Sequence, residues 1–569
     1  MAAGDNADAQ SAADVPNPGA DSGADPTFVA LTGPASAFAM GERDGIRRFL
    51  NAPADLAVMI EAARRFGAQT CVVDFDETGA ERRLSYDAIF AWRDRLVPAL
   101  RLRRGDHVAI AMRNSAEWIV GFLAVIEAGG VAVLVNSRVA APELLAMIED
   151  TDPAVVLTDR AGAAALNTGG RRMIDLTVPL DRPLPAMRPA DPERAQADDP
   201  CAILFTSGTT GRVKGAVLSH SNLITGLMST QLAGMMVIHN LARHYGMPVD
   251  ALLAQLPQQA SLLVAPLFHV SGLGSAFLSP FMAGSKVVIM RRWDPGEAAR
   301  LIAREGVSMF SAVPTMLWDI LQCAGRDQFD LSSLRNIGCG GQALPVNLVE
   351  AVHAVCPQAQ IGTGYGMTEC AGAIAQAVGA DFLRRPAAAG RLLPIVDVRI
   401  EAEDGSLLPV GAAGEIVVRG AQVMRGYWNR PDETAAVLSP DGWLRTGDIG
   451  MVDAEGYVTI VDRKKDMVIS GGENIYCAEV ERALGEIGAV QECATFGVPD
   501  DRLGERLVAV VVAQGMTEAQ IIAQVAQRLA RYKAPTRVAF SADLLPRNTV
   551  GKIDKLALRK AWPQLSGEQ

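Results

Sequence analysis

The sequence predicts an α/β fold: a large N-terminal domain of two α/β subdomains plus a small distorted β-barrel, followed by a small α+β C-terminal domain. Candidate helices alternate with short apolar strands from Leu84 to Asp159, and the pattern recurs from Cys201 to Leu393. This alternation is typical of parallel sheets covered by helices. Shorter strands crowded by glycine turns, at 395–401 and 415–419, then indicate the small barrel.

The strands of the first alternating region are short and apolar. We expect them at Val108–Met112, Val131–Val135 and Ala154–Leu157. Runs of this length, bounded by turn residues, are typical of strands buried in a parallel sheet.

The charged run from Asp462 to Asp466 marks a junction. Beyond it we expect a helix from near Ala478, a strand at Leu507–Ala513 and a helix after Thr517 with its apolar residues on one face. These elements indicate a compact second unit. We therefore divide the chain into a disordered leader (1–28), an N-terminal domain (29–463), a junction (464–466) and a C-terminal domain (467–569).

Composition excludes several classes of function. The net charge of −11 over 569 residues argues against a general nucleic-acid surface, which requires clustered Lys and Arg. The eight cysteines form no CxxC pair, so neither a disulfide framework nor a zinc site is indicated, and a cytoplasmic location fits best. No stretch reaches the ~18 apolar residues of a membrane span, which leaves only peripheral membrane contact open.

The segment FTSGTTGRVKG, Phe205 to Gly215, follows the apolar residues 202–204 directly. A strand that ends in a loop rich in glycine and hydroxyl groups can surround phosphate oxygens with backbone N–H groups. The spacing does not match a Walker loop, because no Gly-Lys pair stands at the required offset. An ordinary turn is the alternative, and other motifs must decide between the two.

Eight motifs follow this loop in order. They are PLFHVSG (266–272), GCGGQALP (338–345), GYGMTE (364–369), GEIVVRG (414–420), GYWNRPDET (426–434), WLRTGDIG (443–450), DRKKDMVISGGENIY (462–476) and PRNTVGKID (546–554). Together they resemble the adenylate-forming superfamily, AMP-dependent synthetases and ligases, in its acyl-CoA synthetase branch. The resemblance spans roughly residues 80 to 560.

The resemblance implies the substrates and the reaction. A small carboxylic acid would join the α-phosphate of ATP with release of pyrophosphate, and the thiol of coenzyme A would then attack the acyl adenylate. Mg²⁺ would accompany ATP, close to Thr206 and Glu369, since this hard ion suits a hydroxyl and a carboxylate. The resemblance also implies that the C-terminal domain is mobile.

The resemblance assigns the ATP-binding residues. The phosphate loop would act through Thr206, Ser207, Gly208, Thr209, Thr210, Gly211 and Lys214. The adenine would lie against Tyr365, beside Gly340, Gly341, Gln342, Gly364, Gly366 and Met367, whereas Thr368 resembles the family's phosphate-contacting threonine. Asp448 would accept the ribose hydroxyls, assisted by Arg463.

The remaining assignments concern the acid and coenzyme A. Lys552 resembles the lysine that stabilises the α-phosphate during adenylation, Lys465 falls on the hinge, and Gly471 and Gly472 would line the path of pantetheine. His269 would lie at the acyl pocket. Because a histidine stands where amino-acid-activating relatives carry Asp, the sequence speaks against an α-amino acid.

The identity of the acid stays open between alternatives. The small and apolar residues after Glu369 favour a medium- or long-chain fatty acid, with an aryl or alicyclic acid next. Loading of a carrier protein and a catalytically silent binding protein are the rival functions. The connection between Asn222 and Pro266 is longer than usual for the family and is expected to form a lid or an edge element, whereas the oligomeric state is not predicted.

Overall fold

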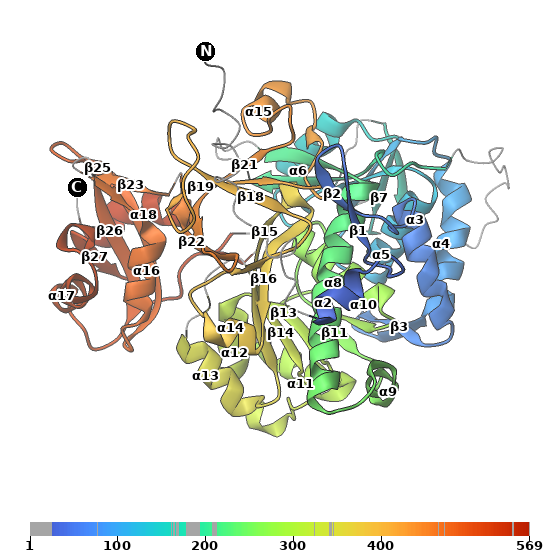
Figure 1. The fold of residues 1–569 in the computed structure, drawn as a ribbon, viewed down its shortest axis with the longest axis horizontal. Coiled ribbons are helices and arrows are strands. Elements are labelled where there is room, and N and C mark those ends of the chain that lie inside the picture. Colours follow the sequence, from blue (N-terminus) through green and yellow to red (C-terminus); the bar gives the residue numbers. More distant parts are fainter. Residues whose placement is uncertain are drawn as a thin grey trace, which may run out of the picture.

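The computed structural model describes residues 26–76, 78–160, 162, 166, 170–177, 194–207, 213–323, 325–340, 344, 346–464, 466–470, 473–548 and 551–567. The fold is mixed α/β, with a large N-terminal domain and a small C-terminal domain that lies beside it (Figure 1). Of the predicted strands, those near 108, 131 and 154 are confirmed at His107–Ala111, Val131–Leu134 and Val155–Thr158.

The first sheet carries the phosphate loop. Its strands lie in the order β20-β10-β9-β6-β5-β7-β8. The bounds are β5 (His107–Ala111), β6 (Val131–Leu134), β7 (Val155–Thr158), β8 (Arg172–Asp175), β9 (Pro200–Ser207), β10 (Val213–Ser219) and β20 (Gly426–Tyr427). β9 runs parallel to β6, whereas β10 turns back antiparallel to β9. The turn between β9 and β10 therefore sits at the carboxyl edge of the parallel strands, where α/β sheets commonly bind ligands.

The second sheet joins both remaining parts of the N-terminal domain. Its strands follow the order β18-β19-β21-β22-β17-β16-β15-β14-β13-β11-β12-β3-β4. The bounds are β3 (Thr70–Phe75), β4 (Glu81–Ser85), β11 (Ala260–Leu263), β12 (Lys286–Ile289), β13 (Met309–Ala312), β14 (Asn336–Gly340), β15 (Gln360–Met367), β16 (Gly372–Val378), β17 (Gly390–Leu392), β18 (Asp397–Glu401), β19 (Gly414–Arg419), β21 (Leu444–Val452) and β22 (Tyr457–Arg463). The neighbouring strands β3, β12, β11, β13, β14 and β15 pair parallel. The strands β16, β17, β22, β21, β19 and β18 pair antiparallel. A short hairpin of β1 (Met40–Arg43) and β2 (Ile46–Phe49) stands apart.

Helices cover these sheets. In the N-terminal domain they are α2 (Pro26–Thr32), α3 (Leu56–Glu61), α4 (Tyr86–Leu100), α5 (Ala116–Glu127), α6 (Ala141–Thr151), α8 (His220–His244), α9 (Val249–Gln255), α10 (Ser279–Met282), α11 (Pro295–Glu305), α12 (Pro314–Gln322), α13 (Val346–Val355), α14 (Ala380–Arg384) and α15 (Pro431–Ala435), with a π-helix η2 (Ser271–Leu278) and 3₁₀ turns η1 (Ala62–Phe66), η3 (Arg326–Gln328) and η4 (Thr368–Cys370). Side-chain caps fix several starts, and the capping box of Ser219 and Asn222 begins α8. α8 and α9 occupy the long connection predicted at 222–266, and α8 packs against η2 and β16 (Figure 1).

The C-terminal domain has cores of its own. Its sheet runs β24 (Glu473–Ile475), β23 (Val468–Ser470), β26 (Gly504–Ala513) and β25 (Val490–Asp500), with β27 (Arg537–Phe540) parallel to β26. α16 (Cys477–Gly485) and α17 (Glu518–Arg528) pack on one face, α18 (Lys555–Ser566) packs on the other, and η5 (Arg531–Lys533) leads into β27. The two faces bury separate apolar clusters, so this part can be packed without help from the larger domain.

The structure corrects the end of the predicted leader. α2 begins at Pro26, Thr27 is buried, and the guanidinium of Arg243 donates a hydrogen bond to its hydroxyl. Phe28 and Leu31 pack on the main core. Residues 26–28 therefore belong to the folded domain, because their apolar side chains and this hydrogen bond attach them to α8; residues 1–25 lie outside the described residues.

Candidate active site

A cleft of about 3590 Å³ lies between the two domains. It is lined from the N-terminal domain by Thr206, Lys214, His269, Glu369 and Asp448 and from the C-terminal domain by Lys552. Most of the residues predicted from motifs scattered over more than three hundred positions thus face one space.

The phosphate-loop strands bring two predicted residues opposite each other. In the β9–β10 ladder, Lys214 pairs with Thr206, and both line the cleft. The buried apolar residues 201–204 hold β9 in the sheet, which fixes where the loop starts. Gly208, Thr209, Thr210 and Gly211 lie outside the described residues, as does the side chain of Ser207.

Glu369 lies in a buried turn beside these strands. Only 7% of its surface is exposed, and the phenol of Tyr427 donates a hydrogen bond to its carboxylate at 2.9 Å. Burial raises the pKa of Glu369, while the bond from Tyr427 opposes that rise. With the hydroxyl of Thr206 in the same cleft, the donors are a carboxylate and a hydroxyl, the oxygen ligands that Mg²⁺ accepts while it keeps several waters. Within the described residues no group of three or more His, Cys, Asp or Glu is arranged as a metal site.

The strand pair β14–β15 forms the wall predicted for the adenine. Gly340 lies opposite Gly364 in the ladder, and Gly364, Tyr365, Gly366, Met367 and Thr368 follow one another along the cleft. A Cβ at position 366 would stand 2.1 Å from the carbonyl oxygen of Gly372, so close packing on β16 requires glycine there. Gly341 and Gln342 lie outside the described residues.

Tyr365 is connected to the residue predicted for the ribose. Its phenol donates to Asp448 at 2.8 Å, and burial together with the charge of Asp448 raises the pKa of Tyr365. Asp448 on β21 is opposite Arg463 on β22, and the guanidinium lies 3.2 Å from the carboxylate. The predicted adenine and ribose contacts therefore form one hydrogen-bonded unit, although β17 and β16 separate β15 from the adjacent strands β21 and β22 in the sheet.

His269 lies two residues before the start of η2. Its Nδ1 is 2.9 Å from the hydroxyl of Ser271. Burial, and next the positive charge of Lys552, lower the pKa of His269 to about 4. The imidazole is therefore neutral at physiological pH and can contact an acyl group without adding charge to the pocket.

We expect His269 to titrate near pH 4 in an NMR titration, because burial and Lys552 lower its pKa to about 4. In Lys552→Ala the pKa should rise but stay below the ordinary value of about 6.5, since burial is the larger cause. The folded pKa lies below the unfolded value, so stability from this group is lost as pH falls from about 6.5 towards 4. An unchanged His269 pKa in Lys552→Ala would contradict the proximity of the two side chains.

Lys552 is carried on a braced hairpin. The N–H of Asn548 donates to the carbonyl of Lys552 at 2.8 Å, and Arg547 pairs with Glu492 while donating to the carbonyl of Gly551 at 3.1 Å. Gly551 adopts φ +86°, and a Cβ there would lie 3.8 Å from a methyl of Val313, between β13 and α12. The hairpin therefore reaches across the cleft towards the N-terminal domain.

The residues predicted for the hinge and for coenzyme A are not described. Lys465, Gly471 and Gly472 lie outside the described residues. Of the neighbouring residues whose side chains are described, 468–470, 473 and 475 do not line the cleft that contains Lys552. Lys552 and the β23–β24 hairpin thus occupy different places in this arrangement of the domains.

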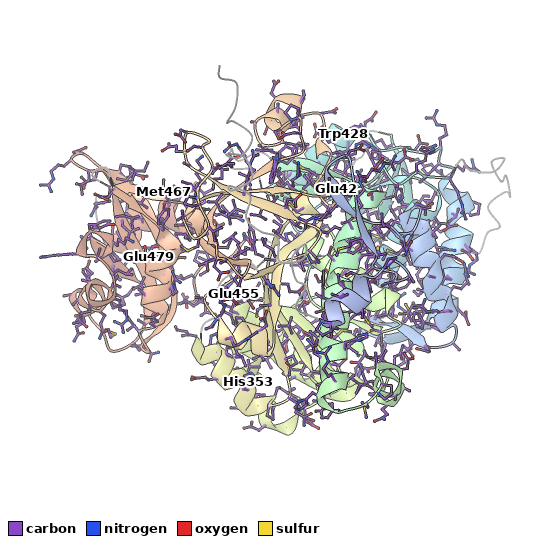
Figure 2. The ribbon with its side chains drawn as sticks, viewed as in Figure 1. Glu42, His353, Trp428, Glu455, Met467 and Glu479 are labelled. Carbon is purple, nitrogen blue, oxygen red and sulfur yellow. The ribbon has the colours of Figure 1, made fainter. Side chains whose placement is uncertain are left out.

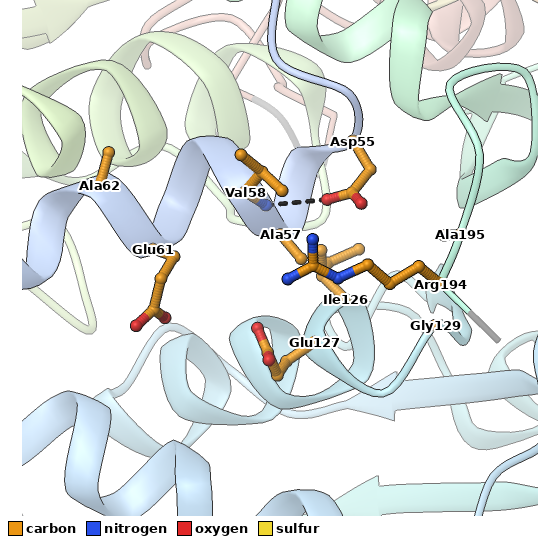
Figure 3. A pocket seen from close by; sticks show the side chains of 10 residues that line it. All are labelled: Asp55, Ala57, Val58, Glu61, Ala62, Ile126, Glu127, Gly129, Arg194 and Ala195. Atoms are coloured by element: carbon orange, nitrogen blue, oxygen red, sulfur yellow. Dashed lines mark hydrogen bonds between the residues drawn. The ribbon is translucent and has the colours of Figure 1, made fainter. Parts of the chain in front are cut away.

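A smaller cavity of about 350 Å³ lies between α3 and α5 and shares no lining residue with the cleft (Figure 3). Asp55, Glu61, Glu127 and Arg194 face it. Asp55 caps α3 through the N–H of Val58, and Glu61 and Glu127 pair with the buried Arg93. These groups serve the packing of α3 and α5.

Two residues that contact the site, Tyr427 and Glu433, were given no role by the sequence motifs. Tyr427 and Glu433 belong to the GYWNRPDET segment, which contributed to the resemblance only as a match. In the structure Tyr427 contacts Glu369, and Glu433 pairs with Lys214. A tyrosine and an acid at fixed spacing in a motif were the available signal, but only the pairing of β20 with β10 shows what they contact.

The fold and the cleft define a two-domain nucleotide-dependent enzyme. Family models match both parts, the AMP-binding enzyme domain at residues 59–428 and the AMP-binding enzyme C-terminal domain at residues 479–552. The chain belongs to the AMP-binding enzyme family, in the acyl-CoA synthetase branch of the adenylate-forming superfamily. It is an acid–thiol ligase and uses ATP, Mg²⁺ and coenzyme A with a small carboxylic acid.

Curated and solved proteins resemble nearly the whole chain. A feruloyl-CoA synthase of an Amycolatopsis species is 37% identical over 82% of this chain and 92% of its own length. A long-chain-fatty-acid–CoA ligase of Mycobacterium tuberculosis is 34% identical over 85% and 94%. The o-succinylbenzoate CoA synthetase of Bacillus subtilis, solved with its acyl-adenylate intermediate, superposes with a TM-score of 0.72 at 28% identity, over 90% and 99%.

Proposed function

We propose that the acid is a medium- or long-chain fatty acid. Its carboxylate oxygen attacks the α-phosphorus of ATP, the bond to the β-phosphate breaks, and pyrophosphate leaves. The coenzyme A thiol, losing its proton, then forms the thioester at the acyl carbon, and AMP departs. The chemistry needs positioning and positive charge more than a protein nucleophile.

The described residues have distinct roles in this proposal. Lys214 faces the β- and γ-phosphates, Lys552 stabilises the charge that develops on the α-phosphate, and Asp448 accepts the ribose hydroxyls. Glu369 and Thr206 hold Mg²⁺, which neutralises phosphate charge when bound. His269, which is neutral, lies beside the carboxylate of the acid substrate. Rotation of the C-terminal domain (467–569) about 464–466 then withdraws Lys552 and brings the β23–β24 hairpin to the cleft for the thiol step.

The observation that carries the fatty-acid proposal is the apolar side of α8. Leu227, Met235, Val237 and Ile238 line the cleft that contains His269, together with Leu253 and Leu256 near α9. Val237, Leu253 and Leu256 are also exposed, by 37%, 40% and 45%. An apolar wall that continues from the cleft to the surface can accommodate a long acyl tail.

A graded panel of acids tests the proposal. We expect pyrophosphate release with coenzyme A to rise in kcat/KM from short to long saturated acids and to be lower for aryl and alicyclic acids. Each methylene buried along the wall contributes about 0.8 kcal/mol to binding. An aryl acid is the second candidate, favoured by the similarity to feruloyl-CoA synthase. A panel with its maximum at an aryl acid would overturn the first choice.

A matched variant localises the tail. Gly234 lies on α8, lines the cleft and has no atom within 4 Å of an added Cβ. Gly234→Phe should reduce kcat/KM for long acids about tenfold or more and leave short acids unchanged, because the ring occupies the tail's path. The substitution also favours the helix, so misfolding is not expected. Equal losses for short and long acids would place the tail elsewhere.

Free coenzyme A is proposed as the acceptor, with carrier-protein loading as the rival. Acyl transfer to a carrier's thiol, with no thioester made from coenzyme A, would establish the rival. We also propose a cytoplasmic location, which the eight free thiols support. Among the described residues, none of the helices is long and apolar enough to cross a membrane.

A further inference from the structure

The segment 426–434 lies directly against the phosphate-loop strand. β20 pairs antiparallel with β10, Tyr427 opposite Ala216, and the N–H of Trp428 donates to the carbonyl of Gly215 at 2.8 Å. Gly215 is the neighbour of Lys214. The pairing of β20 with β10 therefore fixes the position of the side chains of this segment relative to Lys214.

The segment is fixed on its other side as well. The N–H of Tyr427 donates to the hydroxyl of Thr434 at 2.9 Å, and Gly426, at φ +141°, leaves 2.7 Å between an added Cβ and a methyl of Thr434. Trp428, labelled in Figure 2, donates from its indole to the carbonyl of Asp150 at 3.0 Å. α15 therefore packs directly against β20, and this packing places Glu433 on α15 next to Lys214.

Two side chains of the segment contact the site's charges. Glu433 forms an ion pair with Lys214, whose side chain is 13% exposed and that of Glu433 37%. The ammonium of Lys214 also lies 5.1 Å from the centre of the Tyr427 ring, and the Tyr427 phenol donates to Glu369 at 2.9 Å. One tyrosine therefore touches the cation proposed for the phosphates and the carboxylate proposed for the metal.

We propose that Tyr427 and Glu433 are positioning residues that hold Lys214 for the β- and γ-phosphates of ATP. The proposal rests on the phosphate role given to Lys214 above. A lysine ammonium has three donors on a flexible stem, so it can keep Glu433 and donate to a phosphate oxygen at once. Holding the stem in advance removes an ordering cost that binding of ATP would otherwise pay.

The positioning role of Glu433 is tested by whether its replacement weakens or strengthens the binding of ATP. In Glu433→Gln, calorimetry without any acid substrate is expected to show ATP and pyrophosphate bound about two- to fivefold more weakly, the effect typical of an ion pair that is partly exposed to solvent. AMP, which lacks the β- and γ-phosphates, should bind unchanged. Loss of a negative charge alone would strengthen binding of anions. Unchanged or tighter binding of ATP overturns the proposal.

The neighbouring Asp432 provides the matched control. It lies on α15 beside Glu433 and is exposed. Asp432→Asn removes the same charge from the same helix turn and should leave ATP and pyrophosphate affinity at the wild-type level. A weakening equal to that of Glu433→Gln would show that the helix charge, and not the pair with Lys214, is responsible, and would overturn the proposal.

A double-mutant cycle isolates the path of the effect. If Glu433 acts through Lys214, Glu433→Gln has no further effect on ATP affinity in a Lys214→Ala background. A persistent loss there would overturn the proposal.

Tyr427→Phe keeps the ring under Lys214 but removes the hydrogen-bond donor to Glu369. It should therefore weaken ATP binding with Mg²⁺ and leave Mg²⁺-free pyrophosphate binding unchanged. Equal losses in both would show that the hydrogen bond from Tyr427 to Glu369 does not act through Mg²⁺.

The outcome is separable from that of the proposed function. A wild-type protein that binds no ATP, or forms no acyl adenylate from any acid, contradicts the proposed function itself. A wild-type protein that does both, with ATP affinity unaltered in Glu433→Gln, contradicts only the positioning role.

Discussion

Replacing Lys552 with alanine is expected to lower carboxylate-dependent pyrophosphate release about a hundredfold or more, the loss typical for one fixed donor aimed at transition-state charge. The braced hairpin presents this lysine close enough to His269 for its charge to lower the pKa of that residue. The expected loss is in kcat more than in KM for ATP, because Lys552 acts on charge that develops during the reaction. Single-turnover formation of the acyl adenylate measures it.

The second half-reaction provides the control for Lys552→Ala. Attack of coenzyme A on a supplied acyl adenylate should proceed at the wild-type rate, since that step follows the withdrawal of Lys552. Lys560→Ala, at an exposed position on α18, should leave both steps unchanged. Unchanged adenylation in Lys552→Ala would contradict the enzymatic role of this lysine and would favour a ligand-binding function.

The regular elements could be predicted because each has a local cause. The strands near 108, 131 and 154 are short apolar runs, and the strand expected at 507–513 is found as β26 at Gly504–Ala513. The helix expected near Ala478 begins at Cys477, and the one after Thr517 begins at Glu518 behind a capping box of Thr517 and Gln520. Hydrophobic period and caps are properties of neighbouring residues, so the sequence displays them directly.

The contacts of the site could be predicted only in part. The motifs predicted that Tyr365, Asp448 and Lys552 serve one nucleotide, but not that the Tyr365 phenol donates to Asp448. Nor did they predict the pair of Lys214 with Glu433, because the two residues meet only when β20 pairs with β10. Such contacts depend on how strands distant in sequence are arranged in the sheets, and β10 and β20 are more than two hundred residues apart.

The end of the leader was missed for a similar reason. The acidic residues before position 26 predicted disorder, and the one local signal of a helix start, a proline directly after Asp25, was not used. Phe28 and Leu31 are held by the core they pack against, and Thr27 by Arg243 at the far end of α8. Tertiary contacts stabilise a helix of seven residues that would not be stable alone.

Replacing Glu369 with glutamine is expected to lower adenylation about a hundredfold and to raise the Mg²⁺ concentration needed for half-maximal rate, because an amide has no charge to hold the ion. The amide oxygen can still accept the hydrogen bond from Tyr427, so the turn of η4 should keep its structure. Pyrophosphate release over a range of Mg²⁺ concentrations, and ATP binding with and without Mg²⁺, measure the effect.

Glu415→Gln is the matched control for Glu369→Gln. Glu415 lines the same cleft and is equally buried, with 6% exposed against 7% for Glu369, but its carboxylate pairs with Arg445 at 2.9 Å and Lys464 at 3.1 Å. Breaking these buried pairs should cost about 3 kcal/mol, which lowers the Tm of a domain this large by roughly 3 °C, and should leave the Mg²⁺ dependence unchanged. The same Mg²⁺ shift in both variants would mean that the negative charge of the cleft attracts the ion and that Glu369 does not bind it directly.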